Sequence, residues 1–146
     1  MGLQKHKLLV DTNVVLDVLL ARKPFDEWAV NIFKLAALVE VELFISINSF
    51  TDIIYFVSKE YDSDTVRKQM AGLLDFCRII EAGHRDALQS LKLTDFEDIE
   101  DAFQSYCAEK EIIDYIITRD LKGFKSSKIP ALTPQEYLLK STSHSL

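Results

Sequence analysis

The 146-residue sequence is poor in residue types that mark several common classes of protein. Its two cysteines, Cys77 and Cys107, have neither CxxC spacing nor a neighbouring Cys/His cluster, so we expect buried thiols rather than a zinc site. Four glycines and three prolines form no linker, and the chain contains no internal repeat or low-complexity segment. With 48% hydrophobic and 27% charged residues, we expect a single globular domain over residues 1–146.

Long apolar runs and an excess of positive charge are also missing. No apolar run approaches the ~18 residues that span a bilayer, and the first residues lack a hydrophobic signal region, which favours a cytoplasmic protein without membrane contact. The net charge of -6 argues against a protein that coats nucleic acid through its overall field. The local basic segment "RDLKGFKSSK", from Arg119 to Lys128, is either a phosphate-facing edge or a solvated loop.

Short apolar runs alternate with stretches of helical periodicity. Strands are predicted at 7–10, 41–46, 77–82, 114–120 and 129–133, and helices after position 11 and at 26–40, 50–61, 63–77, 84–92, 97–111 and 133–140. The last helix begins with the capping-box pattern of Thr133 and Glu136, with Pro134 at its first position. Strands separated by helices imply parallel pairing. The expected fold class is therefore α/β, with an open, mainly parallel sheet covered on both faces and a strand order that the pattern leaves open.

Polar side chains interrupt the apolar pattern where two predicted strands end. Asp11 follows the run "KLLV", and Asp120 follows "YIIT". Because the carboxyl ends of parallel strands meet at one edge of a sheet, where ligands bind, we expect these two acids to converge. Asp52, in the first turns of the helix after the second strand, is a third acid within reach of that edge. Asn13 is expected to support the site and to cap the helix beginning there.

The segment "TDFEDIEDAFQ" places more acids at the start of a predicted helix. Asp98, Glu100 and Asp101 share its first two turns. An acidic first turn is also a common way to begin a helix, because the positive end of the helix dipole stabilises it, so these acids alone allow two interpretations. The apolar residues expected to face the core recur at helical spacing: Ile99, Phe103 and Tyr106 or Cys107.

Carboxylates gathered at one sheet edge indicate a metal site. They repel one another and lose solvation unless a cation joins them. Mg²⁺ fits best, since it prefers hard oxygen ligands, retains several waters and usually acts on phosphates. Such a metal activates a bound water and neutralises charge as a phosphoryl oxygen is attacked, so a phosphate-cleaving enzyme is the expected class.

Three segments resemble the successive signatures of a known family, the PIN domain. They are "LLVDTNVVLDVLL", "EDIEDAFQSYCAEK" and "DYIITRDLKGF" leading to "IPALTPQEYL". The resemblance runs from about residue 7 to 139 and is in particular to the prokaryotic group allied to the VapC toxins of toxin–antitoxin modules. It implies a three-layer α/β/α sandwich with a mainly parallel central sheet. It also implies a ribonuclease that hydrolyses RNA phosphodiester bonds with Mg²⁺ or Mn²⁺, and an antitoxin partner.

The resemblance assigns roles to the acids one by one. Asp11 matches the family's first metal-binding aspartate, Asp101 the acid on the later helix, and Asp120 the acid after the fourth strand, so these three would bind the metal. The family's other acid, usually a glutamate, falls on Asp52, whose shorter side chain departs from the pattern. Together the four acids would be catalytic. Acids that would supplement them are Asp98 and Glu100.

Other positions match groups that bind substrate or shape the site. Asn13 matches a polar residue of the site, and Thr118 and Arg119 lie where the family often has substrate-orienting groups. Lys122 and the rest of the basic segment would hold flanking phosphates, which positions a strand without reading its sequence. Further cations that would help if the fold brings them near are Arg22, Lys23 and Lys59.

Other α/β classes with acids at strand ends fit less well. A receiver-like signalling domain needs an adjacent acidic pair after the first strand and a lysine after the last, where this chain has "VDTN" and "PALTP". A haloacid-dehalogenase-type phosphatase needs a second aspartate two residues after the first, and position 13 is asparagine. The remaining alternative is a PIN fold kept as a protein-interaction module with weak or no nuclease activity, which the Asp52 departure leaves open.

Two predicted helices, at 26–40 and 50–61, carry more apolar residues than one buried face requires. One interpretation is that both helices are simply well buried. The other is a surface for a partner, either a second copy in a homodimer or an antitoxin.

Overall fold

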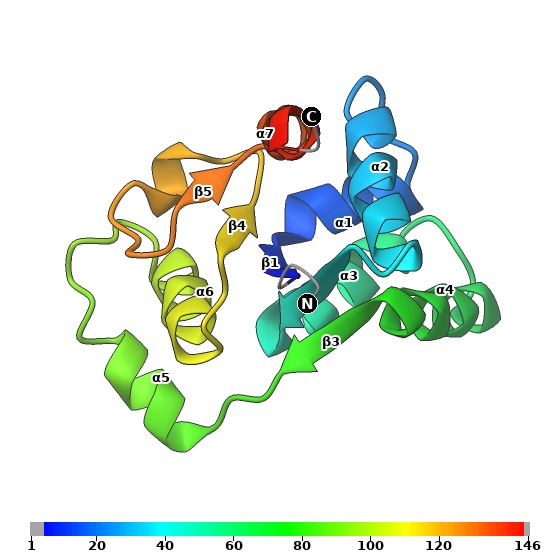
Figure 1. Cartoon of the computed structure of the whole chain (residues 1–146). Helices are drawn as coiled ribbons and strands as arrows, with labels where there is room; N and C mark the ends of the chain where they lie inside the picture. The colour runs from blue at the N-terminus through cyan, green and yellow to red at the C-terminus, as the bar shows by residue number, and fades with distance from the viewer. Residues whose placement is uncertain (1–4, 145–146) are drawn as a thin grey trace.

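The computed structural model describes residues 5–144 and contains a five-stranded, all-parallel sheet with helices on both sides (Figure 1). The strand order is β3-β2-β1-β4-β5. The strands are β1 His6–Val10, β2 Val41–Ser46, β3 Cys77–Ile80, β4 Tyr115–Ile117 and β5 Ala131–Leu132. All five predicted strands and their parallel pairing are confirmed, with shorter bounds for the last three.

Each predicted helix is present, although the one predicted at 50–61 begins and ends earlier. The helices are α1 Thr12–Leu19, α2 Asp26–Ala37, α3 Ile47–Val57, α4 Ser63–Phe76, α5 His84–Ser90, α6 Ile99–Lys110 and α7 Pro134–His144, with a 3₁₀ turn, η1, at Lys122–Phe124. The predicted capping box of α7 is confirmed. The backbone N–H of Thr133 donates to Glu136 Oε1 over 2.9 Å, and that of Glu136 donates to Thr133 Oγ1 over 3.1 Å.

Side chains of the central strand β1 alternate between two cores, as a strand covered on both faces requires. Leu8 and Val10 belong to the core formed with α1, α2, α3, α4 and α7, whereas Leu9 packs on the other face with Cys107 and Ala108 of α6. Figure 1 shows α5 and α6 on the opposite side of the sheet from α1 and α2. The three-layer α/β/α fold is therefore confirmed.

The topology sets the site between β1 and β4. The chain builds outward from β1 through β2 to β3 and then crosses to β4 on the other side of β1. This reversal creates a switch point at the carboxyl ends of β1 and β4, where open α/β sheets bind ligands. Asp11 follows β1 at this point and Asp120 follows β4, so the predicted sharing of one sheet edge is confirmed.

The buried face of α6 differs from the prediction. Ile99, expected to face the core, is 67% exposed. The side chains that are buried on this helix are small or polar: Ala102, Gln104, Ser105, Cys107 and Ala108. The other predicted core positions hold, since Cys107 is fully buried and Phe103 is partly buried against the same core. Small side chains let α6 lie close to the sheet.

Both cysteines are buried thiols, as predicted, and burial raises the pKa of Cys77 to about 12. Among residues 5–144, each helix is too short or too polar to span a membrane.

Candidate active site

Asp11 is held in place by four hydrogen-bond donors. It is the N-cap of α1, a role that we predict for Asn13, and its Oδ1 accepts from the backbone N–H of Thr12 over 2.8 Å and from Gln104 Nε2 over 3.0 Å. Its Oδ2 accepts from Thr118 Oγ1 over 2.7 Å and from Asn13 Nδ2 over 3.2 Å. Two bonds to each oxygen fill the capacity of a carboxylate. The orientation of Asp11 is therefore fixed by the fold.

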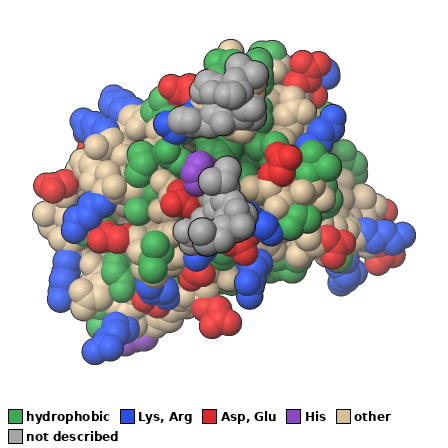
Figure 2. Space-filling view, viewed as in Figure 1, with side chains coloured by type: hydrophobic (Ala, Val, Ile, Leu, Met, Phe, Trp, Pro, Cys, Tyr) green, Lys and Arg blue, Asp and Glu red, His purple; other side chains and the backbone are tan. Residues whose placement is uncertain are grey.

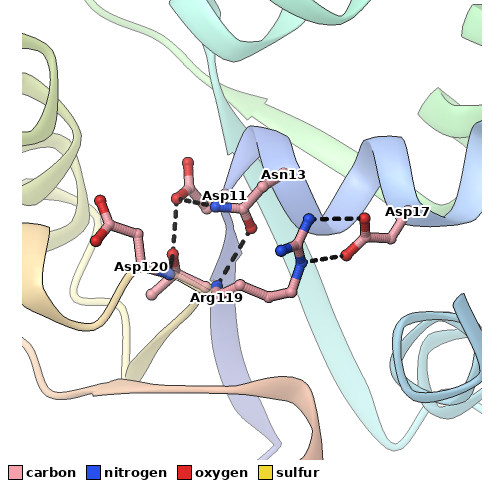
Figure 3. Close-up of polar contacts among 6 residues, drawn as sticks. Asp11, Asn13, Asp17, Arg119 and Asp120 are labelled. Carbon is pink, nitrogen blue, oxygen red and sulfur yellow. Dashed lines mark hydrogen bonds and ion pairs between the residues drawn. The ribbon is translucent and has the colours of Figure 1, made fainter. Parts of the chain in front are cut away.

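Thr118 connects the segment after β4 to the segment after β1. It is fully buried, and its hydroxyl donates to Asp11 while accepting the backbone N–H of Asp120 over 2.9 Å. Beside it, the backbone N–H of Arg119 donates to Asn13 Oδ1 over 3.2 Å (Figure 3). Thr118 thus sets the position of Asp11 relative to Asp120, and its burial gives no support to the predicted contact with RNA.

The side chain of Arg119 points away from Asp120 and along α1 (Figure 3). Its Nε and Nη2 donate to the two oxygens of Asp17 over 2.7 and 3.0 Å, and its guanidinium lies 3.9 Å from the ring centroid of Phe25. Asp17 is completely buried. Arg119, which we predict to orient the substrate, therefore anchors the loop after β4 on α1.

The carboxylates of Asp101 and Asp120 converge on Gly123. A Cβ atom added to Gly123 would lie 2.5 Å from Oδ2 of Asp101 and 2.5 Å from Oδ2 of Asp120. Real Cβ atoms do not approach oxygen this closely, so only glycine leaves room for both acids. The backbone N–H of Gly123 also donates to Asp120 Oδ1 over 3.2 Å. The glycine of "RDLKGF" is therefore part of the site.

The electrostatics of this pair favour a bound cation. Burial raises the pKa of Asp101 to about 7, and repulsion from Asp98, Asp11, Asp120 and Glu100 adds to the shift. A positive charge beside Asp101 would offset both effects. Asp98 itself caps α6 by accepting the N–H groups of Glu100 and Asp101 over 2.8 and 3.1 Å, so for this one acid the helix-start interpretation is correct.

Asp52 pairs with Glu100. A hydrogen bond with Asp52 raises the pKa of Glu100 and burial raises it further, while the amide of Asn48, 2.8 Å from Glu100 Oε1, opposes the rise. The two acids come from α3 and α6 and line a cavity of about 360 Å³ together with Asp11 and Asp101. The side chain of Glu100 thus reaches Asp52. The family resemblance led us to expect a glutamate at position 52, which would be one methylene longer.

Gln104 is a site residue that the sequence predictions missed. It is 2% exposed, it donates to Asp11, and its Oε1 is buried without a hydrogen-bond partner. It lies three residues after Asp101 and so on the same face of α6. The available signal was its place at the end of "EDIEDAFQ", one helical turn beyond the acid.

Basic side chains flank the acids on two sides. Lys122 and Lys125 line a cavity of about 210 Å³ with Asp101 and Asp120. Arg22 lines the cavity of about 360 Å³ on the α3 side. Lys23 and Lys128 instead form ion pairs with Asp26 and Glu109 at 3.0 and 3.5 Å.

The donor set suits a hard divalent cation held from one side. Mg²⁺ is commonly bound by one or two carboxylates and fills its other positions with water and substrate phosphate. Asp101 and Asp120 offer such a pair. Among residues 5–144, no three acidic, histidine or cysteine side chains gather closely enough to form a ready-made cage, and the oxygens of Asp11 are already hydrogen-bonded. Direct metal binding by Asp11 therefore stays a prediction.

Comparisons with known proteins agree with this architecture. The chain is 26% identical over 139 residues to Ribonuclease VapC1 of Aquifex aeolicus, covering 92% of this chain and 95% of that protein. A chain in the structure of VapBC2 from Rickettsia felis bound to a promoter DNA fragment superposes with a TM-score of 0.67, at 16% identity over 87% of this chain and 98% of that one. A chain of a toxin–antitoxin complex from Klebsiella pneumoniae gives a TM-score of 0.66, at 22% identity over 87% and 97%.

The family itself is identified by sequence. Residues 7–122 match the model of the PIN domain, a range that contains all four predicted catalytic acids and Lys122 at its end. The matched segment is most of the chain and runs from β1 to η1. The chain therefore belongs to the PIN domain family.

Proposed function

We propose that this chain is a divalent-metal-dependent endoribonuclease that hydrolyses RNA phosphodiester bonds. The observation that carries the proposal is the meeting of the Asp101 and Asp120 carboxylates over Gly123, beside an Asp11 held by four donors. Membership of the PIN domain family and similarity to Ribonuclease VapC1 support the reaction class. A hard cation on carboxylates at a sheet edge is suited to phosphate chemistry, which RNA provides.

The proposed metal ligands are Asp101 and Asp120. Asp11 joins them if its longest contact, 3.2 Å from Asn13 Nδ2, gives way. When bound, Mg²⁺ or Mn²⁺ supplies a Lewis acid for a phosphoryl oxygen and lowers the pKa of a water molecule. The chain's own contribution is to orient the acids: Thr118 and Gln104 hold the carboxylate of Asp11, and the Arg119 ion pair anchors the loop that carries Asp120.

Glu100 is proposed to act as a general acid, with Asp52 raising its pKa. Because the hydrogen bond with Asp52 raises its pKa, Glu100 retains a proton more readily than an ordinary glutamate. A carboxyl group that holds its proton more readily is suited to act as a general acid. We assign it the protonation of the leaving oxygen, with Asp52 as the group that tunes it.

The surface charges favour local contacts with RNA. On the face in Figure 2, Lys and Arg side chains are interspersed with Asp and Glu side chains, and the net charge is -6. Phosphate contacts must then come from a few cations at the site, of which Lys122 is the proposed first. Binding through so few phosphates weakens only modestly with added salt.

We further propose that the chain is a toxin with a protein antitoxin. The structural relatives from Rickettsia and Klebsiella are toxin–antitoxin assemblies. An apolar cavity of about 380 Å³ between α1, α2 and α4, lined by Val18, Val30 and Phe33 among others, would accept an apolar segment of such a partner. The homodimer that the sequence suggested is proposed as well, and light scattering of the purified protein tests it.

Purified protein incubated with RNA and Mg²⁺ or Mn²⁺ tests the enzyme. We expect cleavage that EDTA abolishes and that Asp11→Asn and Asp101→Asn each reduce strongly. The matched control is Asp64→Asn, which changes an exposed carboxylate on α4 and should cleave like wild type. Equal cleavage by wild type and both site variants would reveal a contaminant. No cleavage at all would favour a protein-interaction module without nuclease activity. This is the specific alternative because four hydrogen bonds already occupy the carboxylate oxygens of Asp11.

A further inference from the structure

The outer face of α3 continues the acidic site as a row of aromatic and basic side chains. Asp52 and Phe56 are four residues apart on one face of α3, and Lys59 follows in the turn after the helix ends at Val57. Tyr55 lies beside them. Tyr55 is 60% exposed and Phe56 37% exposed, so both rings reach solvent.

The rings and the ammonium group of this face are in contact. The ring centroids of Tyr55 and Phe56 are 5.3 Å apart at an interplanar angle of 78°. Lys59 Nζ lies 4.4 Å from the Tyr55 centroid and 5.3 Å from that of Phe56. These contacts lie in the ranges for edge-to-face and cation–π attraction, which makes the three side chains one surface.

This surface opens into the proposed active site. Phe56 and Arg22 line the same cavity, of about 360 Å³, as Asp11, Asp52 and Asp101. In the part of the chain that the structure describes, neither Arg22 nor Lys59 forms an ion pair with a carboxylate. Two cations and two rings therefore adjoin the acids on the α3 side of the site.

Flat rings and cations next to phosphate chemistry fit a single-stranded nucleic acid. Such strands are bound by aromatic rings that stack on unpaired bases and by cations that follow the phosphates. We propose that Phe56 and Tyr55 stack on an unpaired base next to the cleaved bond, with Arg22 and Lys59 contacting the adjoining phosphates. The inference rests on the proposed ribonuclease function and adds the residues that would bind the strand beside the cleaved bond.

The subsite accepts any base. Stacking uses the ring face, which every base offers, and Phe56, the ring that lines the cavity, has no group that reads base edges. Discrimination at this position is therefore between unpaired and paired RNA, because a base inside a duplex has no free face for Phe56.

A tryptophan at position 56 reports stacking without any cleavage. Trp28 is the one tryptophan of the chain, so Trp28→Phe with Phe56→Trp moves the single indole to the α3 face. A short single-stranded RNA added in EDTA should quench the introduced indole. The control is Trp28→Phe with Phe76→Trp, whose indole lies at the α2–α4 cavity, is similarly exposed, and should not respond.

Kinetics with Mg²⁺ separate stacking from simple bulk. Phe56→Ala and Phe56→Leu should each raise KM roughly tenfold with kcat little changed, whereas Phe56→Trp keeps a low KM. Leucine fills apolar space but has no ring, so a KM for Phe56→Leu equal to that of wild type would overturn the inference. A duplex of the same sequence should bind equally weakly to wild type and Phe56→Ala.

The remaining outcomes distinguish a failure of the stacking subsite from a failure of the proposed ribonuclease function. An indole at position 56 that RNA does not quench, in a preparation whose wild type cleaves RNA, overturns the stacking subsite and leaves the ribonuclease standing. Quenching without any cleavage by wild type supports the subsite and refutes the ribonuclease. A wild-type dimer that Phe56→Ala converts to monomers, with KM unchanged, assigns this face to an interface between copies and overturns the inference.

Discussion

Arg119 and Asp17 form a two-point ion pair that ties the loop after β4 to helix α1 across 102 residues of sequence. The pair is asymmetric in its exposure, because the Asp17 side chain is completely buried while that of Arg119 is 29% exposed. The loop carries Thr118 and Asp120, and α1 begins at Asp11. The ion pair therefore fixes the two halves of the site relative to each other.

Loss of Arg119 should destabilise the protein more than loss of the charge on Asp17. Arg119→Ala leaves a buried carboxylate without its two donors, which costs about 3–5 kcal/mol of unfolding free energy. Asp17→Asn removes the buried charge and keeps a polar group, so its effect should be smaller. Urea unfolding followed by circular dichroism measures both. The matched control is Arg67→Ala in the exposed Arg67–Asp64 pair, which should change stability by less than about 1 kcal/mol.

The test is the order in which these variants lower the free energy of unfolding. If Arg119→Ala were no more harmful than Arg67→Ala, the pair would not be an anchor. The double variant Asp17→Leu with Arg119→Met should recover much of the stability lost by Arg119→Ala, because apolar groups of similar volume can replace a buried ion pair.

Replacing Gln104 should lower the cleavage activity more than it lowers the stability of the fold. Gln104→Leu removes the bond to Asp11 Oδ1, and it also removes a buried Oε1 that has no partner, so the two effects on unfolding free energy oppose each other. Without this donor Asp11 can turn, and we expect kcat to fall by roughly 10- to 100-fold. Cleavage assays and thermal unfolding of the same preparation measure this. A large fall in melting temperature with kcat unchanged would contradict the positioning role.

Gln104 was not predictable from the sequence, unlike the acids beside it. The acids after β1 and β4 were predictable, because the carboxyl ends of parallel strands share an edge and nothing further needs to be known. The buried face of α6 was not, since periodicity weighs large apolar residues such as Ile99. Helices that pack closely on a sheet bury small residues instead. Gln104 is buried among them because it donates a hydrogen bond to Asp11.

The roles of residues after β4 were less predictable than their position. Thr118, Arg119 and Asp120 were expected together at the site, and they lie there. Which of them faces the substrate depends on partners remote in the sequence. Asp17 appears in the sequence as a polar interruption of a helix, and only the tertiary fold shows that it takes the guanidinium of Arg119.

The stability of the metal-free protein should fall as pH rises through the titration of Asp101. Its pKa is raised from 3.8 to about 7 in the folded state, so the folded protein binds this proton more tightly than the unfolded chain does. The stabilisation is complete below the ordinary pKa of 3.8 and is lost as pH approaches 7. Urea unfolding in EDTA across this range measures the loss. Asp101→Asn, which carries no titrating proton, should flatten this part of the profile; an unchanged profile would refute the raised pKa.

A methyl group at position 123 should separate the two carboxylates without unfolding the protein. In Gly123→Ala the new Cβ would stand 2.5 Å from Oδ2 of both Asp101 and Asp120, so these side-chain ends must move. The backbone needs no rearrangement, because no glycine of residues 5–144 has a positive φ. Displacement of reacting groups by about 1 Å costs roughly 100-fold in rate, and affinity for Mg²⁺ measured by calorimetry should fall as well. Gly72→Ala is the control: nothing lies within 4 Å of its added Cβ, and the helix should gain about 0.5–1 kcal/mol with cleavage unchanged. Full activity and metal affinity in Gly123→Ala would mean that Asp101 and Asp120 do not hold the metal together.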